Sequence, residues 1–439
     1  MGDDVIFTPL AMPNLTIKNR VLRSSISGRI DNYDGSGTRA RLNWEKKFAR
    51  TGVGAIISSH VPVSLRGRIL PNYAFIDRDE RIGFWRAVGD AVHALDCKFI
   101  LQLSHAGRQQ DIAGIENLGH HSVSASARVE QFNGFTPDAL TRPMIATIVR
   151  QFADGARRAR AAGLDGVELH ASNGYLFSQF LSSAINDRKD DYGGALANRA
   201  RFLLEVIAAV RREVGRDFFL GVKLGPVDHH NAVTFWESRG NTLAEGVEIA
   251  RWVEAAGADA IHVSTGSMFP HPRNPPGDFP LDVAERTYPA MMGEGAHTLR
   301  NYVVFRYKPL WPVARALWNR DKGDVIEGIN VPDARAVKDA VKIPVLVTGG
   351  FQTASVVRRV ITSGAADAVT IARPLMASYD LLDRWRAGHD RPARPCTYCN
   401  KCLVNVLEHP LGCYEESRFP SYDAMIAEVM SVFEDEVGE

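Results

Sequence analysis

Residues 242–266 read TLAEGVEIARWVEAAGADAIHVSTG. Thr242 and Glu245 have the spacing of a capping box, in which two side chains satisfy backbone groups at the start of a helix. Gly257 is typical of the residue that ends such a helix. The apolar run at 260–266 follows directly and has the length of a buried strand. This stretch therefore predicts one helix followed at once by one strand.

The same succession recurs along the chain. Gly163 precedes the run GVELH at 166–170, just as Gly257 precedes the run at 260–266. Nearly continuous apolar runs are typical of strands covered on both faces, and helices between them permit parallel pairing. The predicted strands are 20–26, 55–61, 98–105, 166–170, 220–225, 260–266, 345–350 and 368–373. Eight such strands predict an α/β fold, the (β/α)8 TIM barrel.

Two segments have no counterpart in a minimal barrel. Residues 267–330 separate the sixth strand from the next helix, whereas such loops usually have about 2 to 6 residues. Their many Pro and aromatic residues argue against a disordered linker. Because loops after barrel strands stand over the active-site face, we expect a lid over a substrate; contacts between subunits are an equally weighted alternative. We expect a barrel over 1–378, with this long insertion after strand 6, and a short cysteine-bearing extension with an acidic tail over 379–439.

The composition excludes several classes of protein. The chain has 52 basic and 51 acidic residues among 439, and a net charge of +1 is too small to attract nucleic acid or an anionic membrane. The acidic start, MGDD, lacks the pattern of a signal peptide, and no apolar run is long enough to span a bilayer. Five cysteines, four of them near the C-terminus, do not suggest a secreted disulfide framework. We expect a cytoplasmic homo-oligomer that acts on a small molecule.

The most informative motif is HASNGYLFSQFLS at 170–182, followed by NDR at 186–188, DYGG at 191–194 and NR at 198–199. A lone His at a strand end is more often structural than catalytic. This whole set, however, closely resembles the old yellow enzymes and their relatives, including the 2,4-dienoyl-CoA reductase branch. The resemblance runs through roughly the whole barrel. It implies a flavin-dependent oxidoreductase.

The resemblance assigns catalytic roles to three residues. His170 and Asn173 match the pair of donors that bind the carbonyl or nitro oxygen of an activated alkene, where negative charge develops as hydride arrives. Tyr175 matches the residue that gives a proton to the neighbouring carbon. The implied catalytic residues are therefore His170, Asn173 and Tyr175.

The resemblance also implies positions that bind FMN. Gln102, in the third strand, matches the residue whose side chain bonds the flavin ring. Lys223, in the fifth strand, stands where the family usually has Arg, and its charge would stabilise the reduced flavin. Gly349, Gly350 and Arg373 resemble a phosphate cradle after the last two strands. The implied FMN-binding residues are Ser25, Ser27, His60, Gln102, Lys223, Gly349, Gly350, Ala372 and Arg373.

Three positions depart from the family pattern. Asn173 stands where many bacterial relatives have His, which changes the donor geometry. Ser27 takes the place of a Thr or Cys beside flavin O4; it donates the same hydrogen bond but lacks the redox tuning of a thiol. His60 replaces a small residue. These departures leave the substrate preference open.

Four cysteines form a second candidate site. The segment CTYCNKC supplies Cys396, Cys399 and Cys402, and Cys413 follows. Four thiolates at this spacing suffice for a [4Fe-4S] cluster or a tetrahedral zinc ion. The resemblance to the branch with dienoyl-CoA reductase and trimethylamine dehydrogenase favours the iron–sulfur cluster, although one gap is a residue shorter than in that branch. Zinc is the second choice and unliganded thiols the third. Cys97 is expected to be a buried packing residue.

The predicted function follows from these assignments. We expect an FMN-dependent enzyme that passes hydride from NADH or NADPH through the flavin to an electron-poor alkene of enone, enoyl or nitroalkene type. The first alternative is a dehydrogenase or demethylase that drains electrons through the cluster to a partner protein. The second is a catalytically silent barrel that serves as a binding module. The intact set of His170, Asn173 and Tyr175 favours catalysis.

Overall fold

A computed structural model of the chain describes residues 4–26, 28–110, 122–231, 237–265, 268, 270–292 and 295–434. Eight parallel strands close into a barrel, because each pairs with the next and the last pairs with the first. They are β3 (Val21–Arg23), β4 (Ala55–Ile57), β6 (Lys98–Ser104), β9 (Gly166–Ala171), β10 (Phe219–Leu224), β11 (Ala260–Val263), β12 (Val345–Thr348) and β13 (Ala368–Ile371). The predicted (β/α)8 barrel and its eight strands are confirmed. A two-residue strand, β5 (Val61–Pro62), extends the barrel beside β6.

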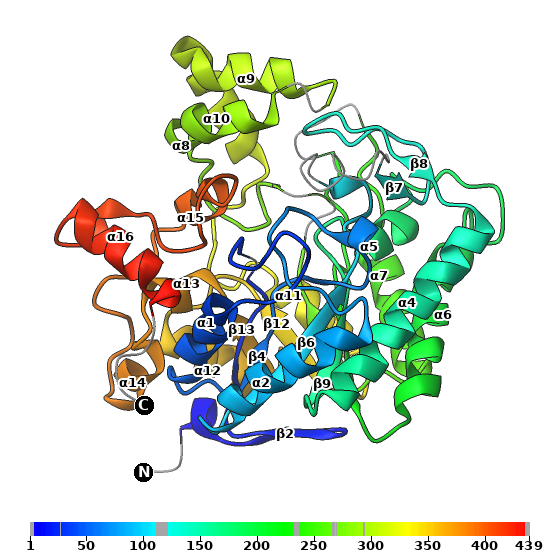
Figure 1. Ribbon diagram of the computed structural model, residues 1–439, viewed down its shortest axis with the longest axis horizontal. Coiled ribbons are helices and arrows are strands. Elements are labelled where there is room, and N and C mark those ends of the chain that lie inside the picture. The colour runs from blue at the N-terminus through cyan, green and yellow to red at the C-terminus, as the bar shows by residue number, and fades with distance from the viewer. Residues whose placement is uncertain are drawn as a thin grey trace.

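Helices connect the strands and cover the barrel from outside (Figure 1). In chain order they are α1 (Arg39–Ala49), α2 (Ile82–His93), α4 (Arg142–Ala161), α6 (Leu196–Val214), α7 (Leu243–Ala255), α11 (Val331–Lys338), α12 (Ala354–Thr362) and α14 (Leu381–Arg386). Helix α7 begins with the predicted capping box of Thr242 and Glu245. The main apolar core lies between these helices and the strands. None of the helices in the described ranges is both long and apolar enough to cross a membrane.

A small hairpin closes the amino-terminal end of the barrel. Strands β1 (Leu10–Met12) and β2 (Leu15–Ile17) pair antiparallel around a turn at Asn14, whose φ is 62°. Their inward side chains pack against the first residues of the barrel strands, forming a closed apolar layer of Leu10, Met12, Leu15, Ile17, Leu22, Ala55, Ile57, Ile100, Phe219, Ala260, Leu346 and Ala368. Figure 1 shows β2 at the opposite end of the molecule from helices α8 to α10. We call this layer the lower plug.

The long insertion after β11 is folded wherever it is described. It carries α8 (Leu281–Thr287), α9 (Thr298–Arg306) and α10 (Trp311–Arg320), which lie above the barrel (Figure 1). These helices share an apolar cluster that includes Leu281, Tyr288 and Phe305. Val404, from the C-terminal extension, belongs to the same cluster. The insertion and the extension therefore support each other.

The C-terminal extension, residues 379–439, follows the short helix α13 (Arg373–Ala377) and begins with α14. It contains α15 (Lys401–Asn405) and α16 (Tyr422–Met430) and runs back along the barrel to α1, where Asn43 donates a hydrogen bond of 3.0 Å to the Val432 carbonyl. Two further short elements, β7 (Val123–Ser124) and β8 (Asp138–Ala139), pair beside α5 (Leu176–Leu181). The extension thus contacts helix α1 as well as the insertion.

Candidate active site

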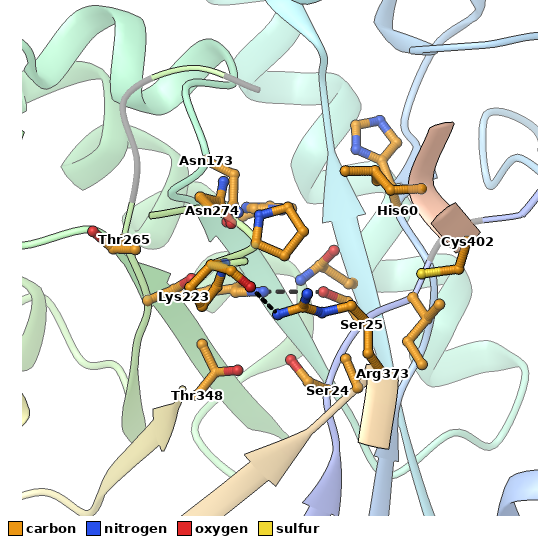
Figure 2. A pocket seen from close by; sticks show the side chains of 18 of the residues that line it. Ser24, Ser25, His60, Asn173, Lys223, Thr265, Asn274, Thr348, Arg373 and Cys402 are labelled. Carbon is orange, nitrogen blue, oxygen red and sulfur yellow. Dashed lines mark hydrogen bonds between the residues drawn. The ribbon is translucent and has the colours of Figure 1, made fainter. Parts of the chain in front are cut away.

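A pocket of about 200 Å³ opens at the carboxyl ends of the barrel strands. Figure 2 shows side chains that reach it from opposite sides, with Lys223 and Arg373 pointing toward one another and Cys402 entering from α15. The predicted catalytic and FMN-binding residues that line this pocket are Ser25, His60, Gln102, His170, Asn173, Tyr175, Lys223, Gly349, Gly350, Ala372 and Arg373. Ser27 lies outside the described residues. We call this cavity the central pocket.

The three predicted catalytic residues come from one turn after β9. His170 is near the end of that strand, Asn173 follows in the left-handed conformation with φ of 60°, and Tyr175 directly precedes α5. Asn is among the few residues that adopt this conformation at low cost. The turn brings the His170 and Tyr175 rings into edge-to-face contact, with centroids 4.7 Å apart. All three side chains are buried and face the same cavity.

Ser172 orients the amide of Asn173. The Ser172 hydroxyl donates to Asn173 Oδ1 and lies 3.4 Å from His170 Nδ1. Because the amide oxygen is engaged by Ser172, the Nδ2 hydrogens of Asn173 remain as donors. Burial lowers the pKa of His170 well below its usual value, so the imidazole is neutral at pH 7. The arrangement supplies an uncharged imidazole and an amide donor at one wall of the central pocket.

The Tyr175 hydroxyl is held in its protonated form. Burial raises the pKa of Tyr175 far above its usual value. The ring of His60 packs against it with centroids 5.1 Å apart, and burial lowers the pKa of His60 to about 3. His60 Nε2 lies 3.3 Å from the Gly67 carbonyl, which holds the ring in place. Tyr175 can therefore act as a proton donor, and His60 is a neutral neighbour.

A buried chain of hydrogen bonds fixes Gln102. Its Nε2 donates to Glu168 at 2.7 Å, and the other carboxylate oxygen of Glu168 lies 2.8 Å from His262 Nδ1. His262 Nε2 lies 2.8 Å from the Thr370 hydroxyl. A carboxylate only accepts hydrogen bonds, so the amide nitrogen of Gln102 must face Glu168. Within the described residues Gln102 Oε1 is buried and has no hydrogen-bond partner.

Lys223 places a cation beside this network. Burial lowers the pKa of Lys223 to about 8, against the opposing charge of Glu168. Burial favours the neutral form of Glu168, but interactions with His262, Lys223 and Gln102 outweigh it and lower the pKa of that carboxyl. Lys223 Nζ donates to the Ser25 hydroxyl at 3.1 Å, which is drawn in Figure 2. Lys223 therefore brings a cation to the floor of the central pocket at neutral pH, beside ionised Glu168.

The backbone of Gly350 and the side chain of Arg373 form the far end of the pocket. Gly350 has φ of 71°, a conformation that glycine adopts without strain, and the Tyr398 hydroxyl donates to its carbonyl. Arg373 donates to the Pro276 carbonyl at 2.8 Å and to Asn400 Oδ1, and its guanidinium lies over the Tyr398 ring. The cysteine segment and the insertion thus hold Arg373 where it borders the pocket.

These features fit FMN. The buried acceptor Gln102 Oε1 suits the imide N–H of an isoalloxazine ring, and Lys223 suits its electron-rich edge. Gly349, Gly350 and Arg373 offer backbone and a cation to a phosphate. One orphaned acceptor, one cation and one glycine cradle along a single cavity match the three chemically different parts of this cofactor.

The four C-terminal cysteines line a separate small cavity next to the central pocket. Cys396, Cys399, Cys402 and Cys413 all border it, and Cys402 borders the central pocket as well. Burial raises the pKa of the thiols of Cys399, Cys402 and Cys413. Within the described ranges, however, no three His, Cys, Asp or Glu side chains are arranged to hold a single metal ion. The predicted metal site is therefore not confirmed, although its four residues are brought together. Cys97 is buried, as expected.

Several lining residues were missed by sequence reasoning. Arg273, Asn274, the two following prolines and Asn330 enter the central pocket from the insertion, and Thr348 lies at the end of β12. From the extension come Leu403, Val406 and Leu411. For these three residues of the extension, the only signal in the sequence was the neighbouring Cys402, which was predicted as a metal ligand. No local pattern marks such residues, because tertiary packing brings them to the site.

The chain is similar to known proteins over most of its length. The chain is 28% identical over 426 residues to the NADH oxidase of Thermoanaerobacter brockii, covering 94% of this chain and 57% of that protein. It is 30% identical to the metal reductase of Desulforamulus reducens, covering 93% and 53%. The chain therefore spans little more than half the length of these relatives. A structure of 2-naphthoyl-CoA reductase with 2-naphthoyl-CoA superposes with a TM-score of 0.74 at 22% identity, over 93% of this chain and 56% of that one, which shows the shared fold.

A sequence model of one family matches residues 5–276, well over half of the chain. The match spans the barrel from the lower plug to the start of the insertion, and includes the turn that carries His170, Asn173 and Tyr175. The protein belongs to the NADH:flavin oxidoreductase / NADH oxidase family.

Proposed function

We propose that the protein binds FMN in the central pocket and transfers hydride from NADH or NADPH to an electron-poor alkene. The observation that carries this proposal is the convergence of His170, Asn173 and Tyr175 on one wall of a pocket that also presents the Gln102 acceptor and the Lys223 cation. Bound FMN would supply the carrier that takes up hydride from the nicotinamide and releases it to the alkene. The chain's own residues bind the substrate, orient it and give it a proton.

His170 and Asn173 bind the activating oxygen of the substrate. As hydride reaches the β-carbon, negative charge develops on that carbonyl or nitro oxygen, and two fixed donors stabilise it. The low pKa of His170 keeps the ring neutral, so it donates a hydrogen bond without giving up a full proton. Removing one such donor typically costs about 100- to 1,000-fold in rate.

Tyr175 gives its proton to the α-carbon. The raised pKa of its hydroxyl keeps the proton in place until the developing carbanion takes it, and water then restores it. With FMN bound, Lys223 would offset negative charge on the flavin ring, and Gln102 Oε1 would accept a hydrogen bond from that ring. Only the reduction of the alkene therefore depends on Tyr175, whereas both half-reactions use His170 and Asn173.

The Tyr175→Phe variant tests this proposal. FMN binding and flavin reduction by the nicotinamide should remain nearly normal, whereas reoxidation by an enone should slow by about 100- to 10,000-fold, measured by stopped-flow absorbance. Changing His170 or Asn173 should slow both half-reactions, because the nicotinamide carboxamide uses the same donors. The control is Tyr192→Phe, whose hydroxyl bonds Glu205 away from the pocket. Normal enone reduction by Tyr175→Phe would exclude the proton-donor role.

A second candidate function rests on the cysteine cavity. We propose that Cys396, Cys399, Cys402 and Cys413 hold a [4Fe-4S] cluster, through which electrons pass between flavin and a partner protein, as a dehydrogenase or demethylase would require. The support is that all four thiols border one cavity, which shares Arg373, Met376 and Cys402 with the central pocket. Buried thiols with raised pKa values need a metal to hold them as thiolates. A cluster of four irons also spreads its ligands more widely than one zinc ion does.

Metal analysis separates these alternatives. Protein purified without oxygen should contain iron and acid-labile sulfide in about equal amounts, near four of each per chain. If the analysis found zinc and neither iron nor sulfide, the cysteines would hold a structural zinc ion and not a cluster. Absence of iron, sulfide and zinc would leave the cysteines as packing residues. A colourless protein that does not take up added FMN would instead favour a silent binding module.

We further propose that residues 1–378 form the catalytic barrel, with 267–330 as its lid, and that 379–439 is an accessory extension. The insertion contributes Arg273 and Asn274 to the pocket wall, which supports a role in covering substrate. Shortening the insertion within its Pro-rich first half should change selectivity between large and small alkenes while FMN stays bound. Unchanged kinetics across a substrate panel would assign the insertion to subunit contacts.

A further inference from the structure

A second cavity, of about 120 Å³, adjoins the central pocket on the side of Tyr175. We call it the inner cavity. Five residues border both spaces: Ile69, Leu70, Tyr175, Leu403 and Val406. The remaining apolar walls come from the insertion, the extension and the loop before β8, and consist of Phe132, Phe135, Pro270, Phe279, Ala284, Tyr288, Met291, Val404 and Leu407. A molecule held at His170 and Asn173 would extend past Tyr175 into this space.

The polar side chains in this wall are already engaged. Both carboxylate oxygens of Glu130 accept backbone N–H groups, from Phe132 and Asn133, at 2.7 Å. The Tyr288 hydroxyl donates to Asn133 Oδ1 at 2.7 Å and accepts from Asn301 at 2.8 Å. Gln109 donates to the Asn173 carbonyl at 2.8 Å. Because these groups are satisfied within the protein, they would gain little from a polar ligand and the cavity favours an apolar one.

The volume of the inner cavity limits the size of the apolar group that it can hold. A protein cavity of about 150 Å³ lined by aliphatic and aromatic side chains holds one benzene molecule. The inner cavity has nearly this volume and five aromatic side chains in its wall. It therefore has room for one six-membered ring or an aliphatic group of equal size, and offers edge-to-face contacts to a flat one.

Two aromatic rings mark the outer limit of this space. Phe132 and Phe279, with centroids 6.3 Å apart, border both the inner cavity and an outer cleft of about 690 Å³. The outer cleft has charged residues in its wall, including Arg300, Arg315 and Lys401. Polar substituents are therefore accommodated beyond the two Phe rings and not between them and Tyr175.

We propose that the inner cavity is the substrate subsite for one ring-sized apolar group, so that the substrate is an electron-poor alkene with a phenyl-like or cyclohexyl-like substituent. This inference rests on the proposed function for the placement of the alkene beside His170, Asn173 and Tyr175. The apolar group lies past Tyr175, against α8 and α15. The ring, and not only the activated double bond, selects the substrate.

Binding without turnover tests the subsite apart from catalysis. The saturated ketone 4-phenylbutan-2-one cannot be reduced at a double bond, yet it carries the ring. Calorimetry with the FMN-loaded protein should show that it binds at least about 10-fold more tightly than butan-2-one. Equal affinities would overturn the subsite even if alkenes are reduced. Tight binding without reduction of any alkene would refute the proposed function and leave the subsite standing.

Filling the cavity provides the second test. Ala284, on α8, is buried and borders only the inner cavity among the spaces described above. Ala284→Phe should lower the ratio of kcat/KM for 4-phenyl-3-buten-2-one to that for 3-buten-2-one by at least about 10-fold. Leu407→Phe fills the same space from the extension and should act in the same direction if Ala284→Phe fails to fold.

The matched control is Leu299→Phe, which adds a ring on the exposed face of α9, where Leu299 is 64% exposed. It should keep both the selectivity ratio and the affinity for 4-phenylbutan-2-one. An unchanged ratio in folded, FMN-loaded Ala284→Phe and Leu407→Phe would overturn the proposal.

Discussion

The two ends of the barrel are built on opposite principles. At the lower plug, a hairpin from one short stretch of sequence covers the strand beginnings with apolar side chains alone. At the upper end, polar side chains from many strands, the insertion and the extension meet around the central pocket. The lower end gains free energy from burial, whereas the upper end buries charges such as Lys223 at a cost. Stability and chemistry are thus separated along one axis.

The largest expected effect on stability comes from opening the lower plug. Ile17 is 1% exposed and packs inside the apolar layer. Ile17→Ala should lower the free energy of unfolding by about 2–5 kcal/mol, because it removes buried methyl groups and leaves a cavity. Urea denaturation measures this. Thr16→Ala, on the exposed face of β2, is the control and should change little. FMN affinity of the folded Ile17→Ala protein should be unchanged, and a loss of affinity would contradict the separation of the two ends.

The next largest effect on stability is expected from the buried carboxyl group of Asp228, in the loop after β10. It accepts the Asn241 N–H at 3.0 Å, and burial raises its pKa to about 6. Between pH 4 and 6 the unfolded chain loses this proton while the folded protein keeps it, so the folded state loses stability as pH rises. The loss is complete above pH 6 and amounts to about 3 kcal/mol. Relative to Asp228→Asn, the wild type should become less stable by this amount from pH 4 to 7 in urea titrations. Parallel profiles would refute the assignment.

Lys223 should show what the buried charge at the upper end contributes to chemistry. A charged hydrogen bond is worth about 1.5–3 kcal/mol, which corresponds to roughly 30–60 mV for a two-electron couple. Lys223→Met should therefore lower the midpoint potential of bound FMN by that amount, measured against redox dyes. Lys223→Arg restores the charge and should stay within about 10 mV of the wild type. Equal potentials in the Met and Arg variants would show that the charge has no such role.

The smallest effect is expected at the rim of the lower end. His93 Nε2 lies 2.6 Å from Asp165, and this hydrogen bond raises the pKa of His93. The stabilisation is complete below about pH 6.5, the unfolded value, and is lost as pH rises through the higher folded value. Because the His93 side chain is about one-third exposed, the effect should stay below about 1 kcal/mol. Thermal unfolding of wild type and His93→Gln between pH 6 and 9 measures it. A difference that grows with pH would contradict the sign.

The sequence was informative where local pattern and structure coincide. The eight strands were predictable because each is a short apolar run between helices, and the turn at His170 to Tyr175 was predictable because its residues are adjacent. The lower plug was not predicted, because β1 and β2 have three residues each and only two inward positions per strand. The inner cavity was not predicted either. Its walls come from residues between Ile69 and Leu407, and only packing brings them together.

Helix α15 borders four spaces within five residues, and its Lys401 lines the outer cleft. Cys402 borders the cysteine cavity and the central pocket, Leu403 the central pocket and the inner cavity, and Val404 the inner cavity. A substitution in α15 therefore has pleiotropic effects: under selection for a new substrate it also alters the surroundings of the flavin and of the thiols. Variants selected in the laboratory for substitutions in α15 would therefore change in substrate choice and in electron transfer at the same time. Substitutions in α8 would act on the inner cavity and the outer cleft, since α8 borders neither the cysteine cavity nor the central pocket.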